Sequence, residues 1–382
     1  MTGPGLVSPG GSPMVVHLIS SNDGLGGAEK VVAAIARSAQ AKGWRTAVVN
    51  PFANRTDPEP FRAFYEPAPY YHRVTRRPSQ LVATRSWAAS VLENLAPTVV
   101  HVHLRHATAL AATIPRPPGT AWLLTHHYGA ILDYQGRRLA SALDRWACRR
   151  LGRAVAVSEA VREYLVGRCG LESSQVAVVP NGWGGQPRPA PLAGCPPTAI
   201  SVANFRPEKG HDVLVRAFGH IASRLPAARL VLVGSGPTEP SVRAEVGRLG
   251  LGASVDFKGH VLDIWPELAK ADVFVLASWY DTFGVAALEA MAAGLPVVAT
   301  ATGGLAEVVG HGRTGFLVPP GDEKALAHRL GQLLTDAGLR RDMGQAAKEV
   351  ASTRSEATMA DTYYEFYESL AAAVGPERAR RP

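Results

Sequence analysis

The chain has 382 residues, 46% of them apolar, a size and composition typical of a globular enzyme with two domains. Its net charge of +8 lies in the first half, because residues 1–185 hold 20 Lys and Arg against 11 Asp and Glu. The three cysteines lack metal or redox spacing and no run of about 18 apolar residues occurs, so we expect neither a cysteine-bound metal nor a membrane-spanning helix.

The basic first half suits an anionic partner or a membrane surface, and a solvated basic surface without a partner is the other interpretation. Nucleic acid is not expected as a partner, because the arginines are scattered and no nucleic-acid-binding module is recognised. Residues 1–13 are rich in Gly, Pro and Ser and are predicted to be a disordered tail. The sparse cysteines indicate a cytoplasmic protein, with peripheral association at the inner face of the membrane through the basic domain.

Short apolar segments predict the parallel strands of a first α/β domain over residues 14–185. These segments are Met14–Ser20, Arg45–Asn50, Thr98–His103, Ala121–Thr125, Ala154–Ser158 and Val176–Pro180. Gly26 and Gly27 lie in a glycine-rich turn between the first strand and a helix that ends at Gly43. Such a turn can bring backbone amides to a phosphate, and a plain tight connection is the alternative. Residues 51–78 have no periodicity and are expected to be a loop region that binds the acceptor.

Histidines gather at and just beyond the C-terminal ends of two of these strands, at the edge where open parallel sheets bind ligands. They are His101, His103, His106, His126 and His127. Metal binding is one interpretation, but no carboxylate or cysteine completes a ligand set by spacing, so no metal site is predicted. His126 can instead cap the loop that follows it.

A second α/β domain is predicted over residues 196–358, after a linker rich in Pro and Gly at 183–197. Its first strand, Thr198–Ala203, precedes the segment NFRPEKG, which places Arg206 and Lys209 in a turn before a helix. Two fixed cations at such a turn can hold a diphosphate, whereas ordinary surface basic residues are the alternative.

The segment from residue 271 to 304 reads ADVFVLASWYDTFGVAALEAMAAGLPVVATATGG. It predicts a strand, a helix and a second strand: Asp272–Ala277, Val285–Ala293 and Pro296–Thr300. Asp281 lies in the loop before the helix, and Glu289 lies eight residues later within it. Amides at a helix start suit an anion, and the carboxylates suit sugar hydroxyls. A buried βαβ unit with a capping Asp and a surface Glu is the alternative.

These segments resemble those of the retaining glycosyltransferases of family 4, the glycogen-synthase-like enzymes with a GT-B fold. The family has two carboxylates at the same separation, followed by the same EAMA-G-PVVAT-GG run, although its usual Glu is Asp281 here. The GGAE, LLTHH and PEKG segments are also similar to family motifs. The resemblance covers nearly the whole chain. It implies an α/β GT-B fold, in which two Rossmann-like domains face each other across a cleft.

The resemblance also implies roles for individual residues. Those implied in catalysis are His127, Arg206, Lys209 and Asp281. Those implied in binding the nucleotide sugar are Gly26, Gly27, Gly234, Val261, Phe283, Gly284, Val285 and Glu289. Lys209 and Arg206 would clamp the diphosphate, with Arg206 replacing a family arginine that usually stands at the position of Asn204.

The activity implied is transfer of a sugar from a nucleotide-diphosphate sugar to a hydroxyl, with retention and without a metal or other cofactor. A UDP-sugar is the favoured donor and GDP-mannose the alternative. The expected acceptor is a lipid-linked, cell-envelope or secondary-metabolite molecule, with anionic acceptors included. A nucleotide-sugar epimerase, a sugar phosphorylase and a non-catalytic sugar-nucleotide-binding protein are the other classes considered. A C-terminal aromatic helix at 359–375 is expected to pack back onto the first domain.

Overall fold

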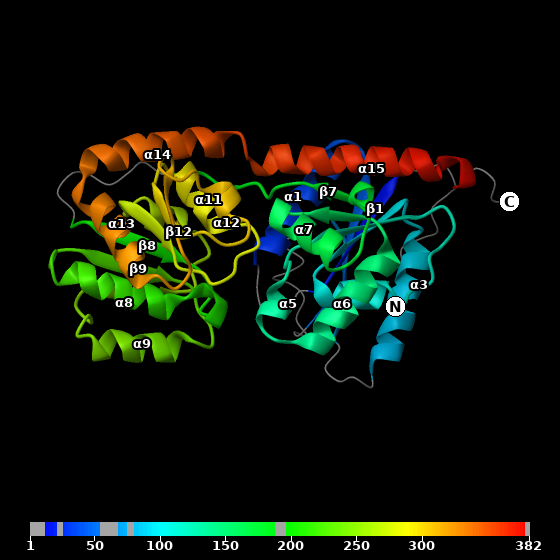
Figure 1. Cartoon of the computed structure of the whole chain (residues 1–382). Helices are drawn as coiled ribbons and strands as arrows, with labels where there is room; N and C mark the ends of the chain where they lie inside the picture. The colour runs from blue at the N-terminus through cyan, green and yellow to red at the C-terminus, as the bar shows by residue number, and fades with distance from the viewer. Residues whose placement is uncertain (1–11, 21–25, 54–67, 75–79, 188–195, 379–382) are drawn as a thin grey trace. The chain divides into compact units, whose positions relative to one another are not determined.

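The computed structural model describes residues 12–20, 26–53, 68–74, 80–187 and 196–378. The chain divides into two compact units: residues 1–180 with 356–382 form unit 1, and residues 181–355 form unit 2. Each unit contains one sheet with helices packed on it (Figure 1). The tail predicted at 1–13 lies outside the described residues up to residue 11, as do 54–67 and 75–78 of the expected acceptor loop.

The sheet of unit 1 has the order β3-β2-β1-β4-β5-β6-β7, and its neighbouring strands pair in parallel. The strands are β1 (Met14–Ile19), β2 (Arg45–Ala53), β3 (Tyr70–Val74), β4 (Val99–His103), β5 (Ala121–His126), β6 (Ala154–Ala156) and β7 (Val176–Val178). The strand order changes direction between β1 and β4, and ligands of open parallel sheets bind outside such a point.

One expectation about this sheet is wrong. The sequence predicts no strand between residues 51 and 78, but β2 extends to Ala53 and β3 pairs with it at the edge of the sheet. The five residues of β3 include Arg73 and His72, so they show no apolar alternation. Its pairing with β2 and the hydrogen bond from Asn50 Nδ2 to Tyr70 Oη, at 3.1 Å, hold it in place.

The helices of unit 1 are α1 (Gly27–Ala41), α3 (Leu81–Leu95), α4 (Arg105–Ala111), α5 (Ile131–Tyr134), α6 (Arg138–Leu151), α7 (Glu159–Gly167) and α15 (Glu356–Arg378). Helices α1 and α15 pack against each other (Figure 1). Helix α4 packs against α6. Because side chains alternate along a strand, successive residues of β5 point to different helices. Thr125 meets α15, whereas His126 meets α6.

Helix α15 completes the core of unit 1, although the whole of unit 2 precedes it in the sequence. Its Tyr363 and Tyr367 are fully buried in a cluster with apolar side chains of α1, β1, β4 and β5. Ion pairs at the helix surface join Lys42 to Asp361, at 2.6 Å, and Arg37 to Glu356, at 2.9 Å. The aromatic face therefore carries the packing, and exposed pairs like these add little.

Unit 2 has a parallel sheet of order β10-β9-β8-β11-β12-β13. The strands are β8 (Thr198–Val202), β9 (Arg229–Val233), β10 (Val255–Gly259), β11 (Val273–Leu276), β12 (Val297–Thr300) and β13 (Gly315–Val318). The helices are α8 (His211–Ala222), α9 (Glu239–Arg248), α10 (Trp265–Leu268), α11 (Val285–Ala292), α12 (Leu305–Val308), α13 (Glu323–Thr335) and α14 (Ala337–Ser352). Its order reverses between β8 and β11, which gives unit 2 a switch point of its own.

The packing of α15 yields a first prediction. Replacing Tyr367 with Ala removes a fully buried ring and should lower the free energy of unfolding by about 3–5 kcal/mol. Guanidinium unfolding measures the change. Glu365→Ala, at an exposed position of the same helix, is the control and should stay within about 0.5 kcal/mol of wild type. Equal midpoints for the two variants would show that α15 does not stabilise unit 1.

Candidate functional site

Lys209 and Asp281 form the centre of the candidate site in unit 2. The Nζ atom of Lys209 lies 2.7 Å from Oδ2 of Asp281, and the two side chains are 24% and 10% exposed. Lys209 ends a short 3-10 helix, Pro207–Lys209, after β8, and Asp281 lies in the loop after β11. These strands are neighbours in the sheet, so the two loops meet although they are far apart in the sequence. The sequence predicts each residue to touch the donor, whereas the structure joins them directly.

The turn that carries Lys209 is fixed by close contact between backbones. Gly210 has a φ of +61°, and a Cβ atom added there would lie 2.1 Å from the carbonyl oxygen of Ala277. The amide of Trp279 also donates a hydrogen bond to the carbonyl of Glu208, at 2.8 Å. Only glycine fits at position 210, and this contact holds the turn against the end of β11.

The loop that carries Asp281 is held by the pair of glycines after β12. The amide of Gly304 donates to the carbonyl of Asp281, at 3.1 Å, and a Cβ atom on Gly303 would lie 2.0 Å from that carbonyl oxygen. Oδ1 of Asp281 accepts from the amide of Phe283, at 3.3 Å. Gly303 and Gly304 therefore hold the loop of Asp281 in position. In the sequence they are the GG that ends the segment 271–304.

The other predicted residues of unit 2 follow the same edge of the sheet. Arg206, Gly234 and Val261 come after β8, β9 and β10, and Arg206 is exposed. Gly284 caps α11 with a φ of +88°, so the helix begins at Val285. Glu289 lies within α11 and is buried, which differs from the alternative of a surface glutamate. Arg206 is joined to the pair through the backbone, because its carbonyl accepts a hydrogen bond from the amide of Lys209, at 3.0 Å.

The predicted residues of unit 1 lie at the corresponding edge of its sheet. Gly26 is the N-cap of α1 and Gly27 is its first residue. Helix α1 follows β1 in the chain, and residues 21–25 between them lie outside the described parts. His127 follows β5, which is separated from β1 by β4. The sequence predicts a glycine-rich turn over residues 22–29, but α1 already begins at Gly27, so Glu29 is helical.

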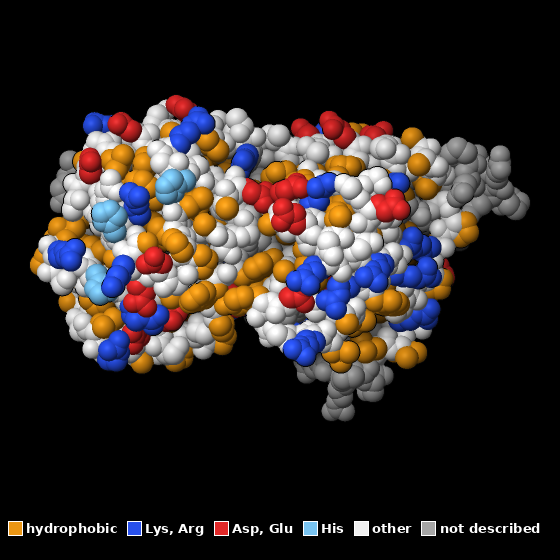
Figure 2. Space-filling model, viewed as in Figure 1, with side chains coloured by type: hydrophobic (Ala, Val, Ile, Leu, Met, Phe, Trp, Pro, Cys, Tyr) orange, Lys and Arg blue, Asp and Glu red, His pale blue; other side chains and the backbone are white. Residues whose placement is uncertain are grey.

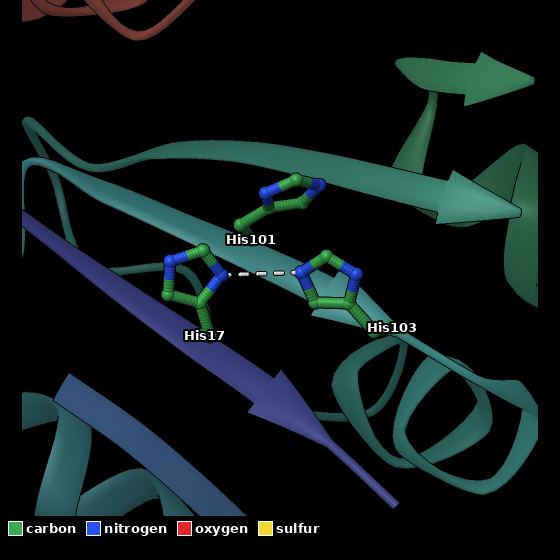
Figure 3. A group of neighbouring side chains, drawn as sticks. All are labelled: His17, His101 and His103. Carbon is green, nitrogen blue, oxygen red and sulfur yellow. Dashed lines mark hydrogen bonds between the residues drawn. The ribbon is translucent and has the colours of Figure 1, made fainter. Parts of the chain in front are cut away.

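His127 ends a line of histidines inside unit 1. Nδ1 of His103 lies 3.2 Å from Nε2 of His127, and Nε2 of His103 lies 3.2 Å from Nδ1 of His17 (Figure 3). Burial lowers the pKa of His17 and His127 to about 3, and burial followed by the neighbouring imidazoles lowers the pKa of His103 well below its usual value. All three rings are therefore neutral at pH 7. His17 was not predicted as a site residue, although it lies two residues after Val15 in β1 and therefore on the same face of the strand.

A metal ion is sterically conceivable at this place but would compete with existing hydrogen bonds. Ligand nitrogens of His17, His101 and His103 lie within 4.8 Å of one another. Both nitrogens of His101 are already bonded, to Tyr367 Oη at 2.5 Å and to Thr125 Oγ1 at 2.7 Å. A cation would have to displace one of these bonds and others at His103, so we keep the expectation that no metal binds here.

His126 has a structural role on the other face of the sheet. Its Nε2 lies 3.2 Å from Oδ2 of the buried Asp144, and its Nδ1 accepts from the amide of Gly129, at 3.2 Å. The second contact agrees with the interpretation that His126 caps the loop after its strand. Of the two neighbouring histidines, His127 is the one whose ring joins the line from β1 and β4.

The comparisons with known proteins identify the family. The profile described as Glycosyltransferase Family 4 matches residues 25–183, and Glycosyl transferases group 1 matches residues 186–350. Over 317 residues the chain is 31% identical to a 2-deoxystreptamine N-acetyl-D-glucosaminyltransferase of Streptomyces fradiae, covering 72% of this chain and 75% of that protein. It is also 39% identical over 150 residues to an N-acetyl-alpha-D-glucosaminyl L-malate synthase of Bacillus anthracis. That match covers 39% of this chain and 39% of that protein.

A solved structure shows the same fold over the whole length. HepE of Anabaena, in complex with UDP, has a TM-score of 0.76 at 21% identity, covering 93% of this chain and 100% of that chain. The chain therefore belongs to the family 4 glycosyltransferases and has the GT-B fold. The family, fold and enzyme class predicted from the sequence are confirmed. In the parts that the structure describes, no helix is long and apolar enough to cross a membrane.

The buried histidines predict how stability depends on pH. An unfolded His has a pKa near 6.5, so between about pH 3 and 6.5 the unfolded chain binds protons that His17 does not. The free energy of unfolding should fall as the pH drops below about 6.5, by up to about 1.4 kcal/mol per pH unit for each such ring. His17→Gln should reduce this slope in denaturant titrations from pH 7 to pH 5. The exposed His328→Gln is the control, and equal slopes in both variants would contradict a neutral buried His17.

Proposed function

We propose that this enzyme transfers a sugar from a UDP-sugar to a hydroxyl acceptor with retention of configuration, without a metal or other cofactor. The Lys209–Asp281 pair, held at the start of α11, is the observation that carries the proposal. The UDP bound to the structurally similar HepE supports the choice of nucleotide. GDP-mannose is the alternative donor.

The pair leaves hydrogen-bonding capacity for both ends of a donor. An ammonium group has three donors, and Asp281 uses one of those on Lys209. The others can bind phosphate oxygens, while the carboxylate keeps lone pairs for a sugar hydroxyl. Because the pair is mostly buried and its loops are fixed by backbone contacts, both groups are placed before the donor binds.

Charge developing on the departing diphosphate is the main demand of the reaction. Lys209 supplies a fixed cation, and the exposed Arg206 supplies a second cation that can approach the diphosphate. The amides at the start of α11 add partial positive charge. These groups do the work that a metal does in other transferases. Retention then proceeds by attack of the acceptor on the face that the diphosphate leaves. His127, neutral at pH 7, contacts a donor-sugar hydroxyl.

Unit 1 is proposed to bind the acceptor. Its positive charge suits an anionic or lipid-linked acceptor, in the cell envelope or in secondary metabolism, and a cytoplasmic enzyme attached peripherally to the membrane. The relatives named above carry glycosyltransferase or synthase names and do not favour the epimerase or phosphorylase alternatives.

Lys209→Ala tests the proposal. Removing the fixed cation should lower kcat for donor turnover by a hundredfold or more with the fold intact, since the cation acts mainly on charge in the transition state. Turnover is measured over a panel of UDP-sugars and GDP-mannose, with and without EDTA. Lys270→Ala, an exposed lysine of the same unit paired with Glu267, is the control. Normal rates for Lys209→Ala would refute the diphosphate clamp.

Asp281 variants test the sugar contact. Asp281→Asn keeps the size but loses a charge-assisted hydrogen bond, so kcat/KM for the true donor should fall roughly ten- to a hundredfold. Asp281→Glu adds one methylene in a packed loop and should change the ranking among donor sugars. Affinity for the free nucleotide diphosphate, measured by calorimetry, should hardly change in the Glu variant. If both variants keep the wild-type rate and ranking, Asp281 only holds Lys209 and the amide of Phe283 in place.

A further inference from the structure

Helix α6 exposes three large apolar side chains, while its buried side holds the carboxylate of Asp144. Its buried residues are Ser141, Asp144, Ala147, Cys148 and Leu151. Leu139, Leu143 and Trp146 are 86%, 49% and 45% exposed and follow each other at helical spacing on the outer side. A surface helix of a globular protein normally turns its large apolar side chains toward the core. We call these three residues the α6 stripe.

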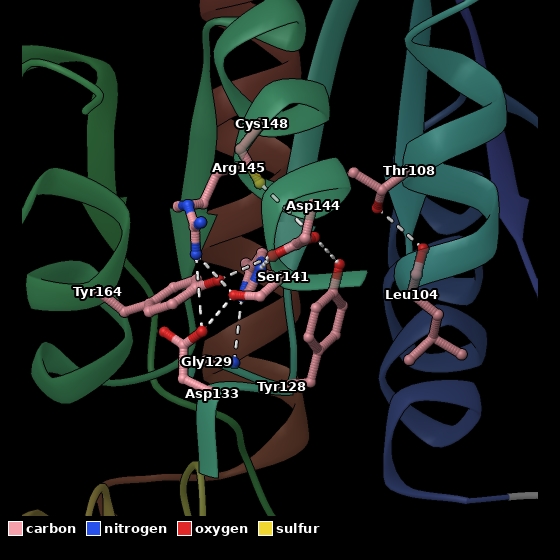
Figure 4. A network of polar contacts seen from close by, with 11 residues as sticks. Leu104, Thr108, Tyr128, Gly129, Asp133, Ser141, Asp144, Arg145, Cys148 and Tyr164 are labelled. Carbon is pink, nitrogen blue, oxygen red and sulfur yellow. Dashed lines mark hydrogen bonds and ion pairs between the residues drawn. The ribbon is translucent and has the colours of Figure 1, made fainter. Parts of the chain in front are cut away.

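The buried carboxylate of Asp144 explains this orientation. It accepts hydrogen bonds from Tyr128 Oη at 2.5 Å and Tyr164 Oη at 3.1 Å (Figure 4). It also lies 3.2 Å from Nε2 of His126. Rotating α6 to bury the stripe would bring the carboxylate out and leave these three partners unsatisfied in the interior. The outward position of the stripe is therefore built into the core of unit 1.

The surroundings of the stripe are cationic. Arg138 and Arg150 are exposed, and neither guanidinium makes a hydrogen bond or ion pair with any residue that the structure describes. Arg145 donates to Ser141 and forms an ion pair with Asp133, at 3.6 Å, and Arg149 donates to the carbonyl of Cys169. The one acidic residue of the helix, Asp144, is buried. Figure 2 shows Lys and Arg side chains mixed with hydrophobic ones on this side of unit 1.

We propose that the α6 stripe docks unit 1 on the surface of an anionic lipid bilayer. Leucine and tryptophan side chains are stable at the boundary between headgroups and acyl chains, and arginines beside them pair with lipid phosphates. This deepens the peripheral placement proposed above and is independent of the transfer chemistry.

A second copy of the chain is the less suitable occupant. In a two-fold dimer through this helix the same patch meets itself, so Arg138 and Arg150 would face the arginines of the other copy. Like charges brought together in this way oppose association. An anionic surface, in contrast, complements the charge and takes up the apolar side chains at the same time.

Co-sedimentation of the full chain with vesicles tests the docking. The vesicles are phosphatidylcholine alone or phosphatidylcholine with about 30% phosphatidylglycerol, at low and high salt. The chain should bind the anionic vesicles, bind the neutral ones at least tenfold more weakly, and be released by salt, since a surface charge is screened within about 10 Å at 0.1 M salt.

Two variants separate the apolar and cationic contributions. Replacing Leu139, Leu143 and Trp146 together with Gln should weaken binding at least tenfold, while Leu262→Gln, at a 91% exposed position of unit 2, should not. Replacing Arg138 and Arg150 with Gln should weaken it by about fivefold per arginine. The matched control replaces the exposed Arg313 and Arg341 of unit 2 and changes the net charge equally. Circular dichroism and the unfolding midpoint verify that each variant folds.

Three results would overturn the proposal: no binding of the wild type to anionic vesicles, unchanged binding of the stripe variant, or equal loss in the matched controls. A concentration-dependent dimer in sedimentation velocity that the stripe variant abolishes would also overturn it, in favour of a second copy. Donor turnover measured on the same preparations keeps the two proposals apart. Failure of vesicle binding with normal turnover refutes the docking surface alone, and lost turnover with normal binding refutes the transfer proposal alone.

Discussion

Within each unit every paired strand runs parallel to its neighbour, so each connection has to return across the sheet before the next strand begins. The loops after the strands then lie at one edge, whatever their separation in the sequence. Lys209 and Asp281 meet because β8 and β11 are neighbours there. Backbone contacts at Gly210 and Gly303, where no side chain fits, hold the two loops in place and so fix the distance between Lys209 and Asp281.

Unit 1 has an unusually polar interior for a parallel sheet. One face carries the histidines of β1 and β4 against the tyrosines of α15, and the other carries Asp144 beneath His126. Most of these polar atoms are buried together with hydrogen-bonding partners, which is the condition under which polar side chains can be buried without a large loss of stability. Nε2 of His17 is a buried nitrogen without a partner among the described residues. The cost of this arrangement appears at the surface, where α6 has no freedom to bury Leu139 and Trp146.

Local patterns in the sequence were sufficient for much of the fold. Strands such as β11 and β12 are short apolar runs, and helix α11 is delimited by Gly284 and Gly294, so their existence follows from neighbouring residues alone. The same holds for the turns that carry Lys209 and Asp281, because a loop between a strand and a helix is a local feature. The strand β3 shows the limit, since five residues with Arg73 and His72 among them carry no periodic signal.

Tertiary structure alone decided which of these local features meet. The pairing of Lys209 with Asp281 spans 72 residues and that of His17 with His103 spans 86, and both depend on a strand order that no single segment encodes. The same is true of the orientation of α6. Its sequence contains an apolar stripe that would ordinarily be buried, and only the partners of Asp144, contributed by β5, by the loop after it and by α7, turn that stripe to the outside. A sequence pattern gives the faces of a helix, but the groups packed against it determine which face is buried.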